Sequence, residues 1–166
     1  MLEHINRLVL PLVVANIVHM IAIRRDWLPA LARPVSARLF GANKTWRGFV
    51  LLPALNALAV PVFSPSAPVA ESVALGALLG AVYMLFELPN SWVKRRLGIA
   101  SGGRAPSHRY LVAAMDKTDS ALGVTLAYWT ITGIAPSEAA ILLLCCSGAH
   151  VFFSLLLVSL GIKRSF

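Results

Sequence analysis

Two short polar segments of this sequence contain the residue types that phosphate and metal chemistry need. Each lies immediately before a long apolar run, where a membrane helix would begin. The first is GANKTWRG, from Gly41 to Gly48. Lys44 and Arg47 can neutralise phosphate oxygens, and Asn43 and Thr45 can donate hydrogen bonds to them. The segment is not a P-loop, because the required glycine and lysine spacing is absent. A positively charged membrane anchor with a capping threonine is the alternative.

The second segment places two carboxylates three residues apart, at Asp116 and Asp119. Residues with this spacing share one face of a helix, so both carboxylates could bind one divalent cation or two bridged cations. The alternative is ordinary capping at the start of a helix. One helix start needs one cap, which favours the metal site.

The composition indicates an integral membrane protein. Of the 166 residues 58% are hydrophobic and 13% are charged, against about 25% charged in soluble domains. The mean hydropathy is +0.75. We expect an all-α fold with one domain, residues 1–166, and five transmembrane helices whose cytoplasmic ends carry the polar site. The expected spans run from Leu8 to Ile23, Gly48 to Phe63, Ser72 to Asn90, Ser120 to Ala135 and Ala139 to Ile162.

The net charge of +8 would suggest a nucleic-acid partner in a soluble protein, but the basic residues follow the membrane instead. With five spans and the N-terminus outside, every Lys and Arg except Arg7 lies on the cytoplasmic side. We therefore expect a cytoplasmic C-terminus and active site, and no nucleic-acid partner. A cleavable signal peptide is disfavoured because Arg24, Arg25 and Asp26 follow the first apolar run.

Three further polar positions are candidates for the site. Glu87 lies near the inner end of the third apolar run, where an ionisable residue is costly and indicates function, unless it reaches the headgroups. Lys94 and Arg95 follow it and could bind phosphate, although basic triplets also anchor helices to anionic lipids. His150, in the fifth apolar run, is either a packing residue or a ligand.

Other segments predict structure. The GxxxG step at Gly76 and Gly80 indicates close helix packing. The stretch from Trp27 to Phe40 could lie along the membrane interface. The loop from Ser91 to Lys117, which contains several glycines, could fold around an anion or act as a mobile lid. The adjacent cysteines, Cys145 and Cys146, are expected to be packing residues.

Three blocks in order resemble the CDP-archaeol synthase family and, more distantly, CDP-diacylglycerol synthases. The family's NKTWRG block matches Asn43 to Gly48, its SFxKRRxG block appears as Ser91 to Gly98, and its DxxD pair is Asp116 and Asp119. The resemblance runs from about Phe40 to the C-terminus. The chain departs from the family at Glu87, usually Asp, at Lys117, where Gln is favoured, and in a longer loop from Ser101 to Ala114.

The resemblance implies five spans, a cytoplasmic site, Mg²⁺, CTP and an anionic glycerolipid phosphate such as archaetidic or phosphatidic acid. The lipid phosphate would attack the α-phosphorus of CTP and release pyrophosphate. Asp116 and Asp119 would bind Mg²⁺, and Glu87 would bind the metal or position water. The triphosphate would be bound by Lys44, Arg47, Lys94 and Arg95, while Asn43 and Thr45 would fix a phosphate or the cytidine. His150 would be a further substrate-binding candidate.

Two other classes of membrane protein remain open as alternatives. A small transporter would relay ions through Glu87 and His150, but it needs polar residues continuing to the outer side, where the connections are short and nearly uncharged. A structural membrane subunit would leave the aspartate pair unexplained. A CDP-alcohol phosphotransferase is disfavoured because its longer Asp-rich signature is missing.

The charge asymmetry makes a topological prediction. In a cysteine-free background, single cysteines at Ser66 and Ser107 should react with a membrane-impermeant thiol reagent from opposite sides of sealed vesicles. The expected span from Ser72 to Asn90 separates the outer loop that contains Ser66 from the inner loop that contains Ser107. Labelling of both positions from one side would contradict the five-span arrangement.

Overall fold

The computed structural model describes residues 1–100 and 109–161, with side chains over 1–100 and 114–161. These residues form helices joined by turns, and within the described ranges the extended structure is one isolated bridge between Pro34 and Thr45. The elements in order are α1 (Leu2–His4), the π-helix η1 (Ile5–Val9), α2 (Leu10–Arg24), the 3₁₀ helix η2 (Pro29–Leu31), α3 (Ala37–Phe40), α4 (Trp46–Phe63), α5 (Val69–Arg96), α6 (Arg109–Thr132) and α7 (Pro136–Ser159).

Four helical segments are long and apolar enough to cross a membrane. They are Leu2–Arg24, Trp46–Phe63, Val69–Arg96 and Pro136–Ser159, each matching one of the expected spans. The remaining expected span, Ser120 to Ala135, falls in α6. This helix contains four charged residues, Arg109, Asp116, Lys117 and Asp119. Its 24 residues give a length of about 36 Å, comparable to the roughly 30 Å hydrocarbon core. The all-helical fold with four candidate spans is confirmed, and the span expected in α6 stays a prediction.

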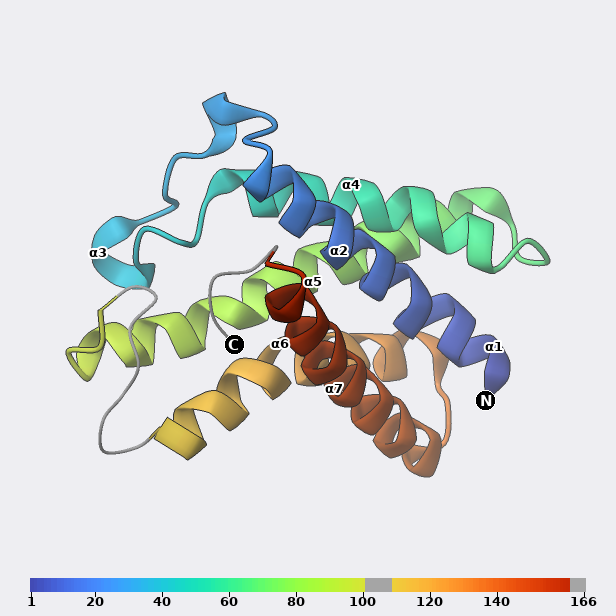
Figure 1. Ribbon diagram of the computed structural model, residues 1–166. Coiled ribbons are helices and arrows are strands. Elements are labelled where there is room, and N and C mark those ends of the chain that lie inside the picture. Colours follow the sequence, from blue (N-terminus) through green and yellow to red (C-terminus); the bar gives the residue numbers. More distant parts are fainter. Residues whose placement is uncertain (101–108, 162–166) are drawn as a thin grey trace.

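The long helices bring their polar termini to one end of the molecule. The N-terminus, the α4–α5 turn and the α6–α7 connection lie on the right of Figure 1, and the segment joining α2 to α4 lies on the left. At the left end the Arg24 guanidinium of α2 donates a hydrogen bond to the Gly161 carbonyl just beyond α7, at 2.7 Å. We call the end formed by Arg24, Trp46 and Arg96 the polar end.

Two helices extend further into the expected loop than the apolar pattern predicted. α5 continues to Arg96 and α6 begins at Arg109, so the expectation of a loop from Ser91 to Lys117 was wrong at both ends. The apolar pattern marks where a helix leaves hydrocarbon, whereas the backbone hydrogen bonds continue beyond that point. The glycines of that loop at 102 and 103 lie outside the described residues.

The segment between α2 and α4 is not one interfacial helix. Its prolines divide it into η2, which begins at Pro29, and the four-residue α3, so Trp27–Phe40 contains only short helical turns. Trp27, Leu28 and Leu39 are nonetheless exposed there. Apolar side chains therefore remain on this surface, as an interfacial segment requires.

Helices α4 and α5 pack backbone to backbone at the two glycines of the GxxxG step. A Cβ on Gly76 would lie 2.3 Å from the carbonyl oxygen of Asn56, and one on Gly80 would lie 2.6 Å from that of Leu52. Both distances are impossible for real side chains, so the contact depends on the absence of a side chain. The predicted packing role of Gly76 and Gly80 is confirmed.

This contact predicts that Gly80→Ala lowers the stability of the purified protein by about 1–3 kcal/mol, because α4 must move away from α5. The matched control is Gly148→Ala in α7, where a Cβ would meet no atom within 4 Å. The stability of this control variant should be unchanged or should rise by up to about 1 kcal/mol, because alanine has a higher helix propensity than glycine. Thermal unfolding in detergent would measure both, and equal melting temperatures would contradict the packing argument.

Candidate functional site

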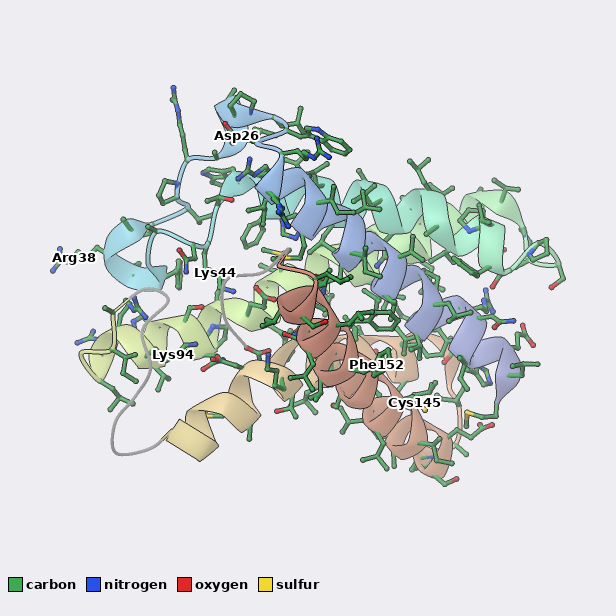
Figure 2. The ribbon with its side chains drawn as sticks, in the orientation of Figure 1. Asp26, Arg38, Lys44, Lys94, Cys145 and Phe152 are labelled. Atoms are coloured by element: carbon green, nitrogen blue, oxygen red, sulfur yellow. The ribbon has the colours of Figure 1, made fainter. Side chains whose placement is uncertain are left out.

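The three polar sequence blocks meet at the polar end of the bundle. The residues in contact come from the segment before α4, from the last turns of α5 and from the first half of α6. We call this set the polar cluster; its members are Lys44, Glu87, Asn90, Lys94, Asp116 and Asp119. Lys44 and Lys94 lie at the same end of the molecule as Asp26 and Arg38, far from Cys145 (Figure 2).

The two aspartates converge on one amide. Asn90 Nδ2 donates to Asp116 Oδ1 at 2.6 Å and to Asp119 Oδ2 at 2.8 Å. Both aspartates lie inside α6, about two turns or more beyond its start at Arg109, so the capping alternative is wrong. Asn90 was not among the residues predicted for the site. Its position one turn after Glu87 and one turn before Lys94 nevertheless places all three on one face of α5.

Each ammonium group of the polar cluster is paired with a carboxylate. Lys94 Nζ contacts Asp116 Oδ1 at 2.5 Å, and Lys44 Nζ pairs with Glu87. Both side chains of the Lys44–Glu87 pair are largely buried. The pairs join α6 and the segment before α4 to the same face of α5, so the cluster is neutralised mostly from within.

A short extended segment positions Lys44. The Lys44 carbonyl accepts from the Val35 amide at 2.8 Å, and the Trp46 amide donates to the Arg33 carbonyl at 3.1 Å. Burial alone would lower the pKa of Lys44, but the charge of Glu87 and the hydrogen bond to it outweigh burial and raise that pKa. Lys44 is therefore an ammonium at neutral pH. The stability linked to its protonation is fully present below its ordinary pKa and is lost as the pH rises through the raised pKa.

Arg47 is not brought to the aspartates. Its guanidinium donates to Asp26 Oδ1 at 2.9 Å and to the Trp27 carbonyl at 3.0 Å, and the residue is 7% exposed. Asp26 and Leu28 both have left-handed backbone conformations, with φ of 50° and 54°. Such conformations cost energy in residues other than glycine, so Arg47 holds a strained turn in place.

The remaining candidates of the two basic blocks also lie outside the polar cluster. Asn43 is exposed, and Thr45 is the N-cap of α4, where its side chain makes no capping hydrogen bond. Arg95 lines a different recess, between α3 and the end of α5, together with Arg38 and Trp92. Their assignment to the triphosphate or the cytidine stays a prediction that these contacts do not support.

His150 lies in a second recess, enclosed by α2, α5, α6 and α7. Its ring stacks on Tyr83 with centroids 6.3 Å apart, and its Nδ1 lies 3.3 Å from the Tyr83 hydroxyl. Asn16 donates to the same hydroxyl at 2.6 Å. The lining includes Val124, about one turn beyond Asp119 on α6, and is otherwise mostly apolar. We call this space the apolar recess.

The fit of a divalent cation depends on the two aspartates. Among the described residues no group of three or more His, Cys, Asp and Glu side chains is placed to bind a metal, and Glu87 is engaged by Lys44. Mg²⁺ nevertheless needs only one or two carboxylates when substrate phosphates and water complete its octahedron. Rotation of the Asn90 amide would place its oxygen beside Asp116 and Asp119, giving three hard oxygen ligands.

The chain is similar to a CDP-archaeol synthase. That enzyme, from Staphylothermus marinus, is 33% identical over 94 residues, which cover 55% of this chain and 48% of the relative. The chain thus aligns with about half the length of this curated relative. No family model matches the chain, and no solved structure matches it. The similarity agrees with the family resemblance of the three blocks.

The position of Arg47 predicts a structural role. Arg47→Ala should lower the free energy of unfolding by about 1–2 kcal/mol, because two hydrogen bonds from a charged donor are lost while the exposed Asp26 stays hydrated. Thermal unfolding in detergent measures the loss, with the exposed Arg25→Ala as the control for charge. A melting temperature no lower than that of the control would contradict the role assigned to Arg47.

Proposed function

We propose that the protein is a CTP-dependent cytidylyltransferase that converts an anionic glycerolipid phosphate into a CDP-activated lipid and releases pyrophosphate. The observation that carries the proposal is the convergence of Asp116 and Asp119 on Asn90, beside Lys94 and the Lys44–Glu87 pair. The name of the curated relative, CDP-archaeol synthase, supports the same reaction.

The proposed reaction needs no covalent enzyme intermediate. An oxygen of the lipid phosphate forms a bond to the α-phosphorus of CTP, the bond from that phosphorus to the β-phosphate oxygen breaks, and pyrophosphate leaves with the electron pair. Both reactants are anions, so the protein must neutralise charge and align the reacting groups. Asp116, Asp119 and the Asn90 amide would hold Mg²⁺, which would supply positive charge against the phosphates when bound.

The protein's own cations supply the second part of this neutralisation. Lys94 has a flexible stem and its ammonium already lies against Asp116, so it can contact a phosphate bound beside that carboxylate. Lys44 is held by Glu87 on the same face of α5. We assign the triphosphate to Lys44 and Lys94, and we assign Glu87 to holding Lys44 instead of binding the metal.

The lipid has a route from the bilayer. The apolar recess opens among the spans, and its Ala121 and Val124 follow Asp119 on α6 by two and five residues. A lipid phosphate at the aspartates could therefore place hydrocarbon against Val124 and Leu12, with the polar trio of Asn16, Tyr83 and His150 beside its glycerol. In this proposal the polar end faces the cytoplasm, where CTP is available.

The aspartates provide the direct test. Asp116→Asn and Asp119→Asn should each lower turnover by at least about a hundredfold, the scale for loss of one preorganised charge contact. The control is Glu71→Gln, an exposed carboxylate in the first turn of α5, at the opposite end of that helix. The assay is pyrophosphate release from CTP that requires both Mg²⁺ and a lipid phosphate, with product identified by mass and ATP as the control nucleotide.

Two results would contradict the proposal. One is near-normal turnover in both aspartate variants. The other is the absence of any CTP-dependent lipid product across ether-linked and ester-linked glycerolipid phosphates, with protein that unfolds cooperatively.

A further inference from the structure

A second basic site lies beside the polar cluster, in the recess between α3 and the end of α5. Its lining consists of Ser36, Arg38, Leu39, Trp92, Arg95 and Arg96, and it holds about 820 Å³ of empty space, counting its open mouth. We call it the arginine recess. Arg38 extends outward from α3 in Figure 2, at the same end of the molecule as Lys94.

Within residues 1–100 and 109–161, no Asp or Glu side chain is placed to pair with these arginines. All seven Asp and Glu residues lie in the described ranges. The carboxylates at the polar end are already engaged: Asp26 by Arg47, Glu87 by Lys44, Asp116 by Lys94 and Asn90, and Asp119 by Asn90. The other three, Glu3, Glu71 and Glu138, lie in the first turns of α1, α5 and α7.

The Arg95 side chain contains a nitrogen that lacks a hydrogen-bond acceptor. Its Nε is buried and has no hydrogen-bond partner among the residues that the structure describes. A buried N–H without an acceptor costs about 1–3 kcal/mol, so an acceptor from outside the chain would recover this energy. The Arg96 guanidinium lies over the Trp92 ring, 5.1 Å from its centroid, so a cation–π contact holds this side chain at the recess.

The arginine recess is distinct from the polar cluster. Consecutive residues of an α-helix point about 100° apart, so Arg95 leaves α5 on a different face from Lys94. Arg96 is rotated by about a further 100°, towards α3. One basic triplet of the sequence therefore serves two sites, with Lys94 at the aspartates and the two arginines at the recess.

The surroundings of the recess suit a membrane surface. Leu39 and Trp92 belong to its lining and are 44% and 40% exposed, and Leu97 beside it is 59% exposed. Apolar and tryptophan side chains next to arginines are typical of the headgroup region. The 28 residues of α5 span about 42 Å, more than the hydrocarbon core, so its last turns reach this region.

We propose that the arginine recess binds the phosphate head group of an anionic membrane lipid. A guanidinium group can donate two parallel hydrogen bonds to two oxygens of one phosphate. The Ser36 hydroxyl adds a further donor in the lining. The lipid's hydrocarbon would extend along the exposed Leu39 and Trp92 into the bilayer. The bound lipid ties α3 to the end of α5 and is not consumed in the reaction.

The test measures lipid retention on the full chain in detergent by native mass spectrometry, with phosphatidylglycerol and phosphatidylcholine as the two probes. Wild-type protein should retain phosphatidylglycerol in preference. Arg95→Gln combined with Arg96→Gln should weaken that retention by about tenfold or more, as expected for lost charged hydrogen bonds. The matched control is Arg25→Gln combined with Arg33→Gln, two exposed arginines of the same end with the same change in charge.

Soluble anions separate a lipid site from a general phosphate site. Inorganic phosphate, pyrophosphate and CTP with Mg²⁺ are added as competitors, and none should displace the lipid at millimolar concentration. Displacement by inorganic phosphate or pyrophosphate would overturn the lipid proposal in favour of a free-phosphate site. Displacement by CTP would overturn the separation of the two sites.

If the control double variant lost phosphatidylglycerol retention to the same extent, the proposal would also be overturned. Lipid binding would then depend on the total charge of the polar end and not on the arginine recess. Thermal unfolding of both double variants shows that they are folded. The readout is independent of nucleotide turnover, so a failure of the cytidylyltransferase proposal and a failure of the lipid site give different results.

Discussion

The backbone contact between α4 and α5 is the constraint on which the rest of the arrangement depends. With no side chain at Gly76 or Gly80, the two helices approach until carbonyl oxygens of α4 face α5 directly. This contact fixes how far α4 slides along α5, and hence which turn of α5 meets the segment before α4. Lys44 reaches Glu87 because of that register. Asn90 and Lys94 follow on the same face of α5 and receive α6.

The features that followed from the sequence were those encoded by local pattern. Long apolar runs predicted four helical spans that the structure contains, and the GxxxG step predicted the α4–α5 packing. The three-residue spacing of Asp116 and Asp119 predicted a shared helix face, and both indeed reach Asn90. In each case the physical cause acts within one or two turns of helix, so it is visible without knowledge of the fold.

The features that could not be predicted depend on tertiary neighbours. Asn90 is a neutral amide with no motif of its own, and its role appears only when α6 places two carboxylates against it. Arg47 was predicted to bind phosphate together with Lys44. Its partner is instead Asp26, which has a left-handed backbone conformation that the periodicity of the sequence does not predict. Lys94 and Arg95 are adjacent in sequence and were assigned to one ligand, yet helical rotation directs them to different sites.

The internal pairing of the polar cluster has a consequence for the kinetics of association. With two ammonium groups and three carboxylates, the cluster presents a slightly negative charge to an approaching polyanion. Long-range attraction must therefore come from the surrounding arginines of the polar end, whose field is screened beyond about 8 Å at physiological ionic strength. Pairs that are largely buried, such as Lys44 and Glu87, are screened much less. Salt thus acts on how fast a polyanion arrives more than on how firmly the cluster is held together.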